Sequence, residues 1–170
     1  MKFHIQIYKI AMKPSYIDFE VEKYKWKPNI NYRENPDLYK IGKGQQGVLI
    51  CQPYKSEISP FWKFRTEKIA KQSANMIYGM FLDYIDCKDF VGADIAKKYL
   101  HMGYTRSRRY ANHRSGKKWI KTETWNILPQ EIDWNTNEKA KSANIFYVFW
   151  KLAREDKEYL EMKRRFQNKM

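Results

Sequence analysis

Nine lysines and arginines lie between Asp94 and Glu123, with no acidic residue among them. This acid-free stretch reads IAKKYLHMGYTRSRRYANHRSGKKWIKT and also holds two of the three histidines. Because neighbouring cations repel one another, a fold keeps such a segment either as a solvated surface or as the binding site of an anion. The planar donor fork of arginine matches phosphate oxygens. The stretch therefore predicts a phosphate-binding surface.

The predicted anion site is centred on one short basic helix that Thr105 would cap. Within it, Arg106, Arg109, Tyr110 and His113 follow the spacing i, i+3, i+4 and i+7, which places them on one face. The first free amides of such a helix carry partial positive charge and bind anions. Further candidates for the same phosphate site flank this face: Arg108, Arg114, Lys117 and Lys118.

This helix and the one before it are predicted to form a basic pair similar to a helix-turn-helix. Asp89 can cap a helix that stops at Gly103, and the helix capped by Thr105 would end at Gly116. The lengths and the glycine-containing turn are those of a helix-turn-helix. Three interpretations stay open: a solvated surface, a recognition helix in the DNA major groove, and a phosphate-binding surface or pocket, which we favour. Aromatic residues that could stack on bases, or belong to the core, are Tyr104, Tyr110 and Trp119.

The loop from Gly42 to Gly47 formally matches G-x-G-x-x-G. In a dinucleotide-binding fold this motif follows a strand and opens a helix, whereas here the strand-like run Val48–Cys51 comes after it. The loop also lacks the ending of a Walker A motif, and the chain lacks the catalytic motifs of a protein kinase. We predict a plain loop before a strand, with phosphate cradling beside Lys43 as the alternative.

Residues for catalysis or metal binding are sparse. His101 and His113 are too far apart to ligate a metal from one helix, and no cysteine or carboxylate lies between them. We predict neither a metal site nor a cofactor. Asp94 could pair with an arginine or position His113, and we favour a structural ion pair. His113 as an acid or base near Arg106 and Arg109 is an alternative, but nothing places a nucleophile beside it, so the catalytic residues are unknown.

The composition is that of one folded, basic domain spanning residues 1–170. The chain has a formal net charge of +14, a pI of about 9.6, and 43% hydrophobic and 16% aromatic residues. These values exclude a disordered basic tail and favour a polyanionic partner. Cys51 and Cys87 have no metal-type neighbours and are read as reduced thiols of a cytoplasmic protein. No signal peptide and no long apolar run is found, so no membrane association is expected.

Hydrophobic periodicity predicts an α+β fold, a single compact domain that is richer in helix than in strand. Helices are predicted from Thr66 to about Tyr84, from Asp89 to Gly103, from Thr105 to Gly116, and from Thr136 to about Phe166. Strands of a small sheet are predicted at Phe3–Ile7, Val48–Cys51 and Lys118–Trp125. Irregular segments are predicted from Pro14 to Pro36 and between Pro53 and Pro60.

Short strings within about residues 24–119 carry a likeness to a known family. The most specific is Arg109-Tyr110-Ala111-Asn112-His113, and the others are Gly47-Val48, Pro53-Tyr54-Lys55-Ser56-Glu57, Trp62, Phe64, Phe90-Val91-Gly92-Ala93-Asp94, Met102-Gly103 and Arg106. Together they resemble an uncharacterised family, a domain of unknown function found in bacteria, fungi and tailed phages. The resemblance implies a compact core at about 24–119, with the N-terminal strand and a helix at 137–166 as additions.

Two further implications follow from this resemblance. Occurrence in phages implies a phage protein that acts on host nucleic acid or host defence, in the host cytoplasm. The strings also include Tyr54 and Lys55, which we therefore add to the candidate phosphate site. The alternative for these two residues is a plain surface loop shaped by the flanking prolines.

The function we favour from the sequence is a non-catalytic protein that binds phosphates of nucleic acid, DNA or RNA. A nucleotide binder or sponge, with the arginines and His113 lining a closed pocket, is the first alternative. An enzyme acting on a phosphorylated substrate is the second, and a protein that meets an acidic partner is the third. A concave pocket would favour a small molecule, whereas a ridge or strip of cations would favour nucleic acid.

Overall fold

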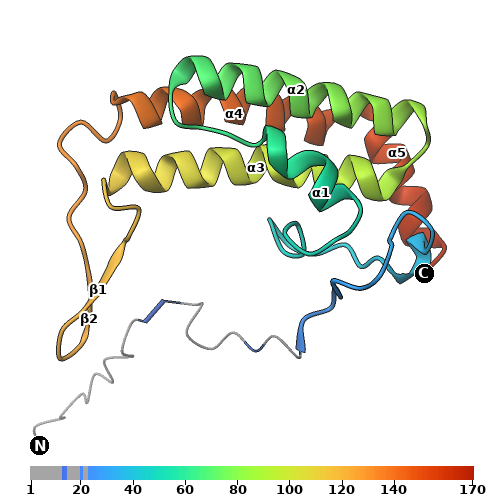
Figure 1. Ribbon diagram of the computed structural model, residues 1–170, viewed down its shortest axis with the longest axis horizontal. Coiled ribbons are helices and arrows are strands. Elements are labelled where there is room, and N and C mark those ends of the chain that lie inside the picture. The colour runs from blue at the N-terminus through green and yellow to red at the C-terminus, as the bar shows by residue number, and fades with distance from the viewer. Residues whose placement is uncertain (1–12, 15–19, 21–22) are drawn as a thin grey trace, which may run out of the picture.

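The helix α3 (Phe90–Asn112) runs through the middle of the protein, and the other elements are arranged around it (Figure 1). The computed structural model describes residues 13–14, 20 and 23–170, so the strand predicted at Phe3–Ile7 lies outside the described residues. The remaining elements, in chain order, are α1 Tyr54–Ile58, α2 Glu67–Asp86, β1 Trp119–Lys121, β2 Trp125–Ile127, α4 Glu138–Glu155 and α5 Lys157–Asn168, with 3-10 turns at Pro36–Leu38 and Ser59–Phe61. The predicted class, a helix-rich α+β domain with a small sheet, is confirmed.

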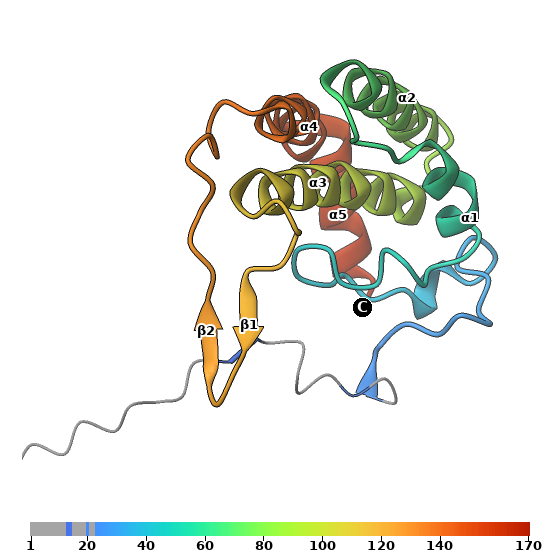
Figure 2. The ribbon, with the colours of Figure 1, turned by 60° about the vertical axis from the view of Figure 1, so that its left-hand side comes forward.

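The three long helices form the body of the domain. Helices α2 and α4 lie side by side against α3, and α5 crosses near the start of α3 (Figures 1 and 2). Helix α3 is buried on most sides between Phe90 and Gly103, but its last turns expose Arg109 and Tyr110. The part of α3 from Phe90 to Gly103 therefore contributes to the core. The last turns, which hold Arg109 and Tyr110, form the open end of α3 and are accessible to a ligand.

A cluster of charged and phenolic groups lies inside this core. The fully buried carboxylate of Asp94 accepts hydrogen bonds from the hydroxyls of Tyr39 (2.5 Å) and Tyr159 (2.6 Å). Its ion pairs are to the ammonium groups of Lys97 (2.8 Å) and Lys98 (3.6 Å). Asp94 thus forms the structural ion pair that we favoured, with lysines as its partners in place of an arginine or His113.

The turn predicted at Gly103-Tyr104-Thr105 is wrong, because α3 continues unbroken from Phe90 to Asn112. Gly103 does not end the helix but lets α4 approach it. A Cβ at this position would lie 2.3 Å from Cδ1 of Phe146. Thr105 is an interior residue of α3 whose hydroxyl donates to the carbonyl of Met102 (3.3 Å) and accepts from Nε2 of Gln45 (2.5 Å). No helix begins at Thr105, so the predicted anion site on free amides is absent there, as is the helix-turn-helix.

Side-chain caps define where the helices begin. Thr66 accepts a hydrogen bond from the amide of Ile69, and Asp89 accepts one from the amide of Gly92, so both predicted caps are confirmed. The helix predicted from Thr136 to Phe166 is instead two helices. Asp156 adopts an extended backbone and caps α5, which ends α4 and changes the direction of the chain.

Between residues 42 and 60, two of the predictions are also wrong. Val48–Cys51 forms turns and not a strand, because Gly47 (φ +85°) reverses the chain and its carbonyl accepts from the amides of Ile50 and Cys51. The Gly42–Gly47 segment is a plain loop, as predicted, and it packs on Trp26. The segment between Pro53 and Pro60 is helical, since it holds α1 and the second 3-10 turn.

The strand predicted at Lys118–Trp125 is an antiparallel hairpin. In its register Trp119 pairs with Ile127, and Lys121 pairs with Trp125. Because side chains alternate along a strand, these four residues share one face of the hairpin. The hairpin projects from the helical body beyond the open end of α3 (Figures 1 and 2).

Candidate functional site

A cleft of about 710 Å³ lies between the last turns of α3 and the β1–β2 hairpin. Four of its lining residues are cationic and two are tryptophans. We call it the basic cleft, and its lining is Pro14, Arg109, Gly116, Lys117, Lys118, Trp119, Ile120, Lys121, Trp125 and Leu128. Among the described residues that line it, none is acidic. The cleft is thus the structural counterpart of much of the acid-free stretch.

None of the four cations of the basic cleft forms an ion pair with a carboxylate of the described residues, although Glu123 lies in the turn of the same hairpin. The side chains of Arg109, Lys117, Lys118 and Lys121 are all exposed. Glu131, which follows the hairpin, accepts from the backbone amide of Arg114 (3.0 Å) and forms a long ion pair with its guanidinium (3.9 Å). A recess lined by one sign of charge focuses the electrostatic field and attracts anions.

The end of α3 sets the position of the hairpin. The amide of His113 donates to the carbonyl of Arg109 (2.9 Å), which completes the last helical turn. The ring of His113 is buried, and its Nδ1 lies 3.1 Å from the carbonyl oxygen of Pro129. The amide of Gly116 then donates to the carbonyl of His113 (2.7 Å) in a turn that leads into β1. His113 therefore fastens the base of the hairpin and does not line the cleft.

Each tryptophan of the basic cleft has a lysine ammonium over its ring. The Nζ of Lys118 lies 5.9 Å from the ring centroid of Trp119, and the Nζ of Lys121 lies 5.9 Å from that of Trp125. Both indoles are half-buried, so part of each ring is accessible. Aromatic faces beside exposed cations can hold a base and its phosphate together.

Of the predicted phosphate-binding residues, the structure brings Arg109, Lys117 and Lys118 together in the basic cleft. Arg108 turns away and binds Oδ1 of Asn112 (2.8 Å) and the carbonyl of Trp134 (3.1 Å). Three other candidates lie outside the lining of the cleft: the half-buried Arg106, the buried His113, and Arg114, which pairs with Glu131.

Tyr54 and Lys55 belong to α1 and lie at the opposite end of α3. The hydroxyl of Tyr54 donates to the carboxylate of Asp89, the cap of α3, at 2.7 and 2.8 Å. From Asp89 to Arg109 the helix rises about 1.5 Å per residue, which separates the two ends by roughly 30 Å. The structure thus does not bring Tyr54 and Lys55 into one site with Arg109.

Two members of the basic cleft, Lys121 and Trp125, were not among the predicted site residues. The sequence pattern places Trp119, Lys121 and Trp125 in a single predicted strand. If a turn is placed at residues 122–124, the same pattern puts both tryptophans and Lys121 on one face. That alternation was the signal available in the sequence.

A second, smaller hollow of about 490 Å³ adjoins Tyr110, and we call it the aromatic hollow. Its lining is Lys63, Phe64, Arg65, Ile69, Tyr110 and Lys139. The ammonium of Lys139 is held by the carbonyls of Phe64 (3.1 Å) and Arg65 (2.8 Å). Burial lowers the pKa of Lys139, as does the nearby charge of Arg65. None of the residues described around this hollow is acidic.

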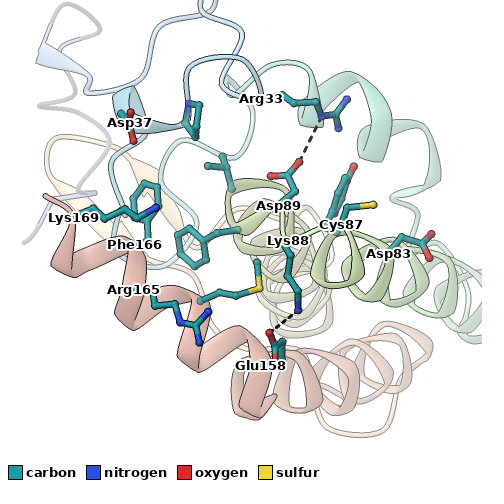
Figure 3. Close-up of a pocket in the computed structure, with 15 residues that line it drawn as sticks. Arg33, Asp37, Asp83, Cys87, Lys88, Asp89, Glu158, Arg165, Phe166 and Lys169 are labelled. Atoms are coloured by element: carbon teal, nitrogen blue, oxygen red, sulfur yellow. Dashed lines mark hydrogen bonds and ion pairs between the residues drawn. The ribbon is translucent and has the colours of Figure 1, made fainter.

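A larger groove, of about 840 Å³, lies at the other end of the molecule, between the start of α3 and α5 (Figure 3). Its charges are balanced: the cations Arg33, Lys88, Arg165 and Lys169 face the acids Asp37, Asp83, Asp89 and Glu158. Several are already paired, since the guanidinium of Arg33 lies 3.5 Å from Asp89, and Lys88 lies 2.8 Å from Glu158 (Figure 3). This groove therefore lacks the excess positive charge that a phosphate site needs.

In the described part of the chain, no group of three or more His, Cys, Asp or Glu side chains is placed to hold a metal ion. None of its helices combines the length and apolar character needed to cross a membrane.

A family model described as "Domain of unknown function (DUF4385)" matches residues 22–169, so the chain belongs to that family. The matched region extends beyond the strings noted in the sequence and includes α4 and α5. No curated protein and no solved structure matches the chain.

Proposed function

We propose that this DUF4385 domain binds nucleic acid through the basic cleft. The observation that carries the proposal is the lining of the cleft: four exposed cations and two tryptophans, with no carboxylate among the described residues. Release of counterions from a phosphate backbone drives binding to such a surface. The net charge of +14 adds a long-range attraction for polyanions.

The distribution of the cations favours a polymer over a single nucleotide. Lys118 and Lys121 are three residues apart around β1, which corresponds to about 10 Å at ~3.3 Å per residue. Cations spaced along such a row can contact successive phosphates of one strand. Nucleotide pockets also enclose most of the ligand surface. Here all four cations are exposed along a helix end and a hairpin.

Fluorescence anisotropy with a labelled 20-nucleotide DNA or RNA, titrated at several salt concentrations, tests this proposal. The affinity is expected to fall steeply with salt, with a logarithmic slope of about −3, because three or four phosphates are neutralised. Arg109→Ala combined with Lys118→Ala should weaken binding at least 10-fold and reduce the slope by about 1 to 2.

The matched control is Lys157→Ala, which removes an exposed cation at the start of α5, far from the hairpin. It should change the affinity less than two-fold. Absence of binding at low salt, or an equal loss in the control and the cleft variant, would contradict the proposal. Tighter binding of a mononucleotide than of the oligonucleotide would favour the small-molecule alternative.

A further inference from the structure

We infer that the basic cleft selects single-stranded nucleic acid and holds unpaired bases on the rings of Trp119 and Trp125. This inference rests on the proposed function and adds the class of ligand to it. Three observations carry it: the placement of the two indoles, the scarcity of base-reading groups on the hairpin, and the aromatic hollow that adjoins the cleft at Tyr110.

The two indoles can stack only on bases whose faces are not covered by neighbouring bases, as in a single strand. In a duplex each base face is covered by its neighbours in the stack, so a protein reaches only base edges and the backbone. An unpaired base can instead lie flat on an aromatic side chain. Both Trp119 and Trp125 line the cleft and are half-buried, so each ring is held by the protein and still offers part of its surface.

The hairpin register sets the spacing of the two rings. Trp119 pairs with Ile127 and Lys121 pairs with Trp125, so the two tryptophans are diagonal neighbours on one face. Diagonal positions of an antiparallel pair are roughly 7–8 Å apart. This is about twice the ~3.4 Å rise of stacked bases, so bases of one strand can occupy both rings while the backbone remains continuous. An ammonium group lies 5.9 Å from the centroid of each ring, close enough to contact a phosphate next to a base stacked there.

A two-stranded ribbon can also enter the major groove of a duplex, but this hairpin is poorly equipped to read one. Major-groove recognition relies on side chains that donate to or accept from base edges. The face of the hairpin that holds Lys121 also carries the two indoles and Ile127. On the other face, Ile120 pairs with Asn126, whose amide already donates to Thr122 and Thr124. Stacking therefore fits the hairpin better than groove reading.

Tyr110 lies between the basic cleft and the aromatic hollow, so a bound strand that passes over it would reach both. A Cβ on Gly116, which lines the cleft, would lie 2.6 Å from Cε1 of Tyr110. On its other side the Tyr110 ring lies 6.0 Å from Phe64 in the hollow. Exposed Lys63 and Arg65 border that hollow. A single strand is flexible enough to contact both the cleft and the hollow, whereas a stiff duplex bends only at a cost in energy.

The test compares one non-self-complementary 20-nucleotide DNA, as a single strand and as its blunt duplex, with the full chain at the same salt concentration. We expect the single strand to bind at least 10-fold tighter and to quench tryptophan fluorescence. Trp119→Ala and Trp125→Ala should each weaken single-strand binding by about 5- to 100-fold, the range for loss of one stacked base, and change duplex binding less than two-fold. Arg65→Ala should weaken binding of the 20-nucleotide strand more than that of a 4-nucleotide strand.

Two controls separate stacking from damage to the hairpin. Trp119→Phe keeps an aromatic ring and should retain single-strand affinity within about three-fold. Trp134→Ala removes an exposed tryptophan that also has an arginine over its ring but lies outside both the cleft and the hollow, and it should leave binding unchanged.

The possible results distinguish the inference from the proposed function. Duplex binding as tight as single-strand binding, with both forms weakened alike by the tryptophan variants, would overturn the single-strand inference and leave nucleic-acid binding intact. Equal loss in Trp119→Phe and Trp119→Ala would show that the ring does not act by stacking. Failure of both DNA forms to bind at low salt would overturn the proposed function itself.

Discussion

At the scale of single residues, Asp94 is the group whose environment departs most from that of a surface side chain. It is fully buried and receives hydrogen bonds or ion pairs from two tyrosines and two lysines. Burial also lowers the pKa of Lys98, while the charge of Asp94 opposes that shift. The pair therefore depends on both partners being present, because either charge alone would be buried without compensation.

We predict that Asp94→Asn lowers the free energy of unfolding by about 3–5 kcal/mol, because it leaves the ammonium of Lys98 buried without its counter-ion. Urea denaturation monitored by circular dichroism measures this change. Asp86→Asn, at an exposed position near the end of α2, is the control and should stay within about 0.5 kcal/mol of the parent chain. A loss below about 1 kcal/mol in Asp94→Asn would show that the cluster contributes little.

The pH dependence of this loss provides a second readout. Burial raises the pKa of Asp94, but the charges of Lys97 and Lys98 outweigh burial and hold it at about 2. An unfolded aspartate titrates near pH ~3.9. The stabilisation is therefore complete above about pH 5 and is lost as the pH falls toward 2. The difference between the parent chain and Asp94→Asn should shrink over that interval, and a constant difference would contradict the assignment.

At the scale of elements, two glycines in neighbouring helices have opposite surroundings. A Cβ on Gly103 in α3 would meet Phe146 of α4, while a Cβ on Gly79 in α2 would have no atom within 4 Å. Alanine favours a helix over glycine by about 1 kcal/mol. We predict that Gly79→Ala raises the free energy of unfolding by about 0.5–1 kcal/mol, and that Gly103→Ala lowers it by about 1–3 kcal/mol through overpacking.

Phe146→Leu separates packing from backbone effects in this pair. If the clash between α3 and α4 causes the loss, Gly103→Ala should be less harmful in the Phe146→Leu background, with a coupling of about 1 kcal/mol in a double-mutant cycle. Thermal and urea unfolding of the four proteins supply the cycle. Independent effects of the two substitutions would show that Phe146 is not the obstacle.

The same glycine shows where prediction from the sequence ended. The caps at Thr66 and Asp89 were predicted correctly, because capping depends on residues within one turn. The sequence pattern predicted that Gly103 ends a helix. In the structure this position needs a glycine because Phe146, far along the chain, packs against it, and a contact of that kind is not visible in the local sequence. Local patterns report local hydrogen bonds, whereas a close approach between helices depends on the packing of the whole body.

The residues of the candidate site likewise divide into those that a local sequence pattern predicted and those that only the fold brings together. Arg109, Lys117 and Lys118 were predicted, since an acid-free run of cations is visible in the sequence. Lys121 and Trp125 were missed, because they join the site through the pairing of β1 with β2. Tyr54 and Lys55 were grouped with the cations through shared family strings, and the length of α3 separates them. Membership in one family does not specify which of the shared strings lie close together in the folded protein.

At the scale of the whole molecule, positive charge is unevenly distributed. The groove beside α5 holds equal numbers of cations and carboxylates, while the described lining of the basic cleft holds cations alone. Of these two sites, the one with excess positive charge lies at the end of α3 where the helix is less buried. An incoming polyanion would be oriented toward that end before any contact forms.

This imbalance predicts that salt acts on folding and on binding in opposite directions. In the free protein a net charge of +14 produces self-repulsion, and salt screens it, with a Debye length that falls from about 30 Å at 0.01 M to about 3 Å at 1 M. The Tm of the free protein should therefore rise between 20 and 500 mM NaCl, by about 2–4 °C for each kcal/mol of repulsion removed.

A bound single strand should raise the Tm at 20 mM NaCl by mass action and lose this effect at 500 mM, because salt weakens its binding. Differential scanning fluorimetry with and without the oligonucleotide measures both trends. In a variant with Lys117, Lys118 and Lys121 all changed to Gln, both trends should be smaller. A Tm of the free protein that falls with salt would show that attractive ion pairs, such as those along α5, outweigh the repulsion between cations.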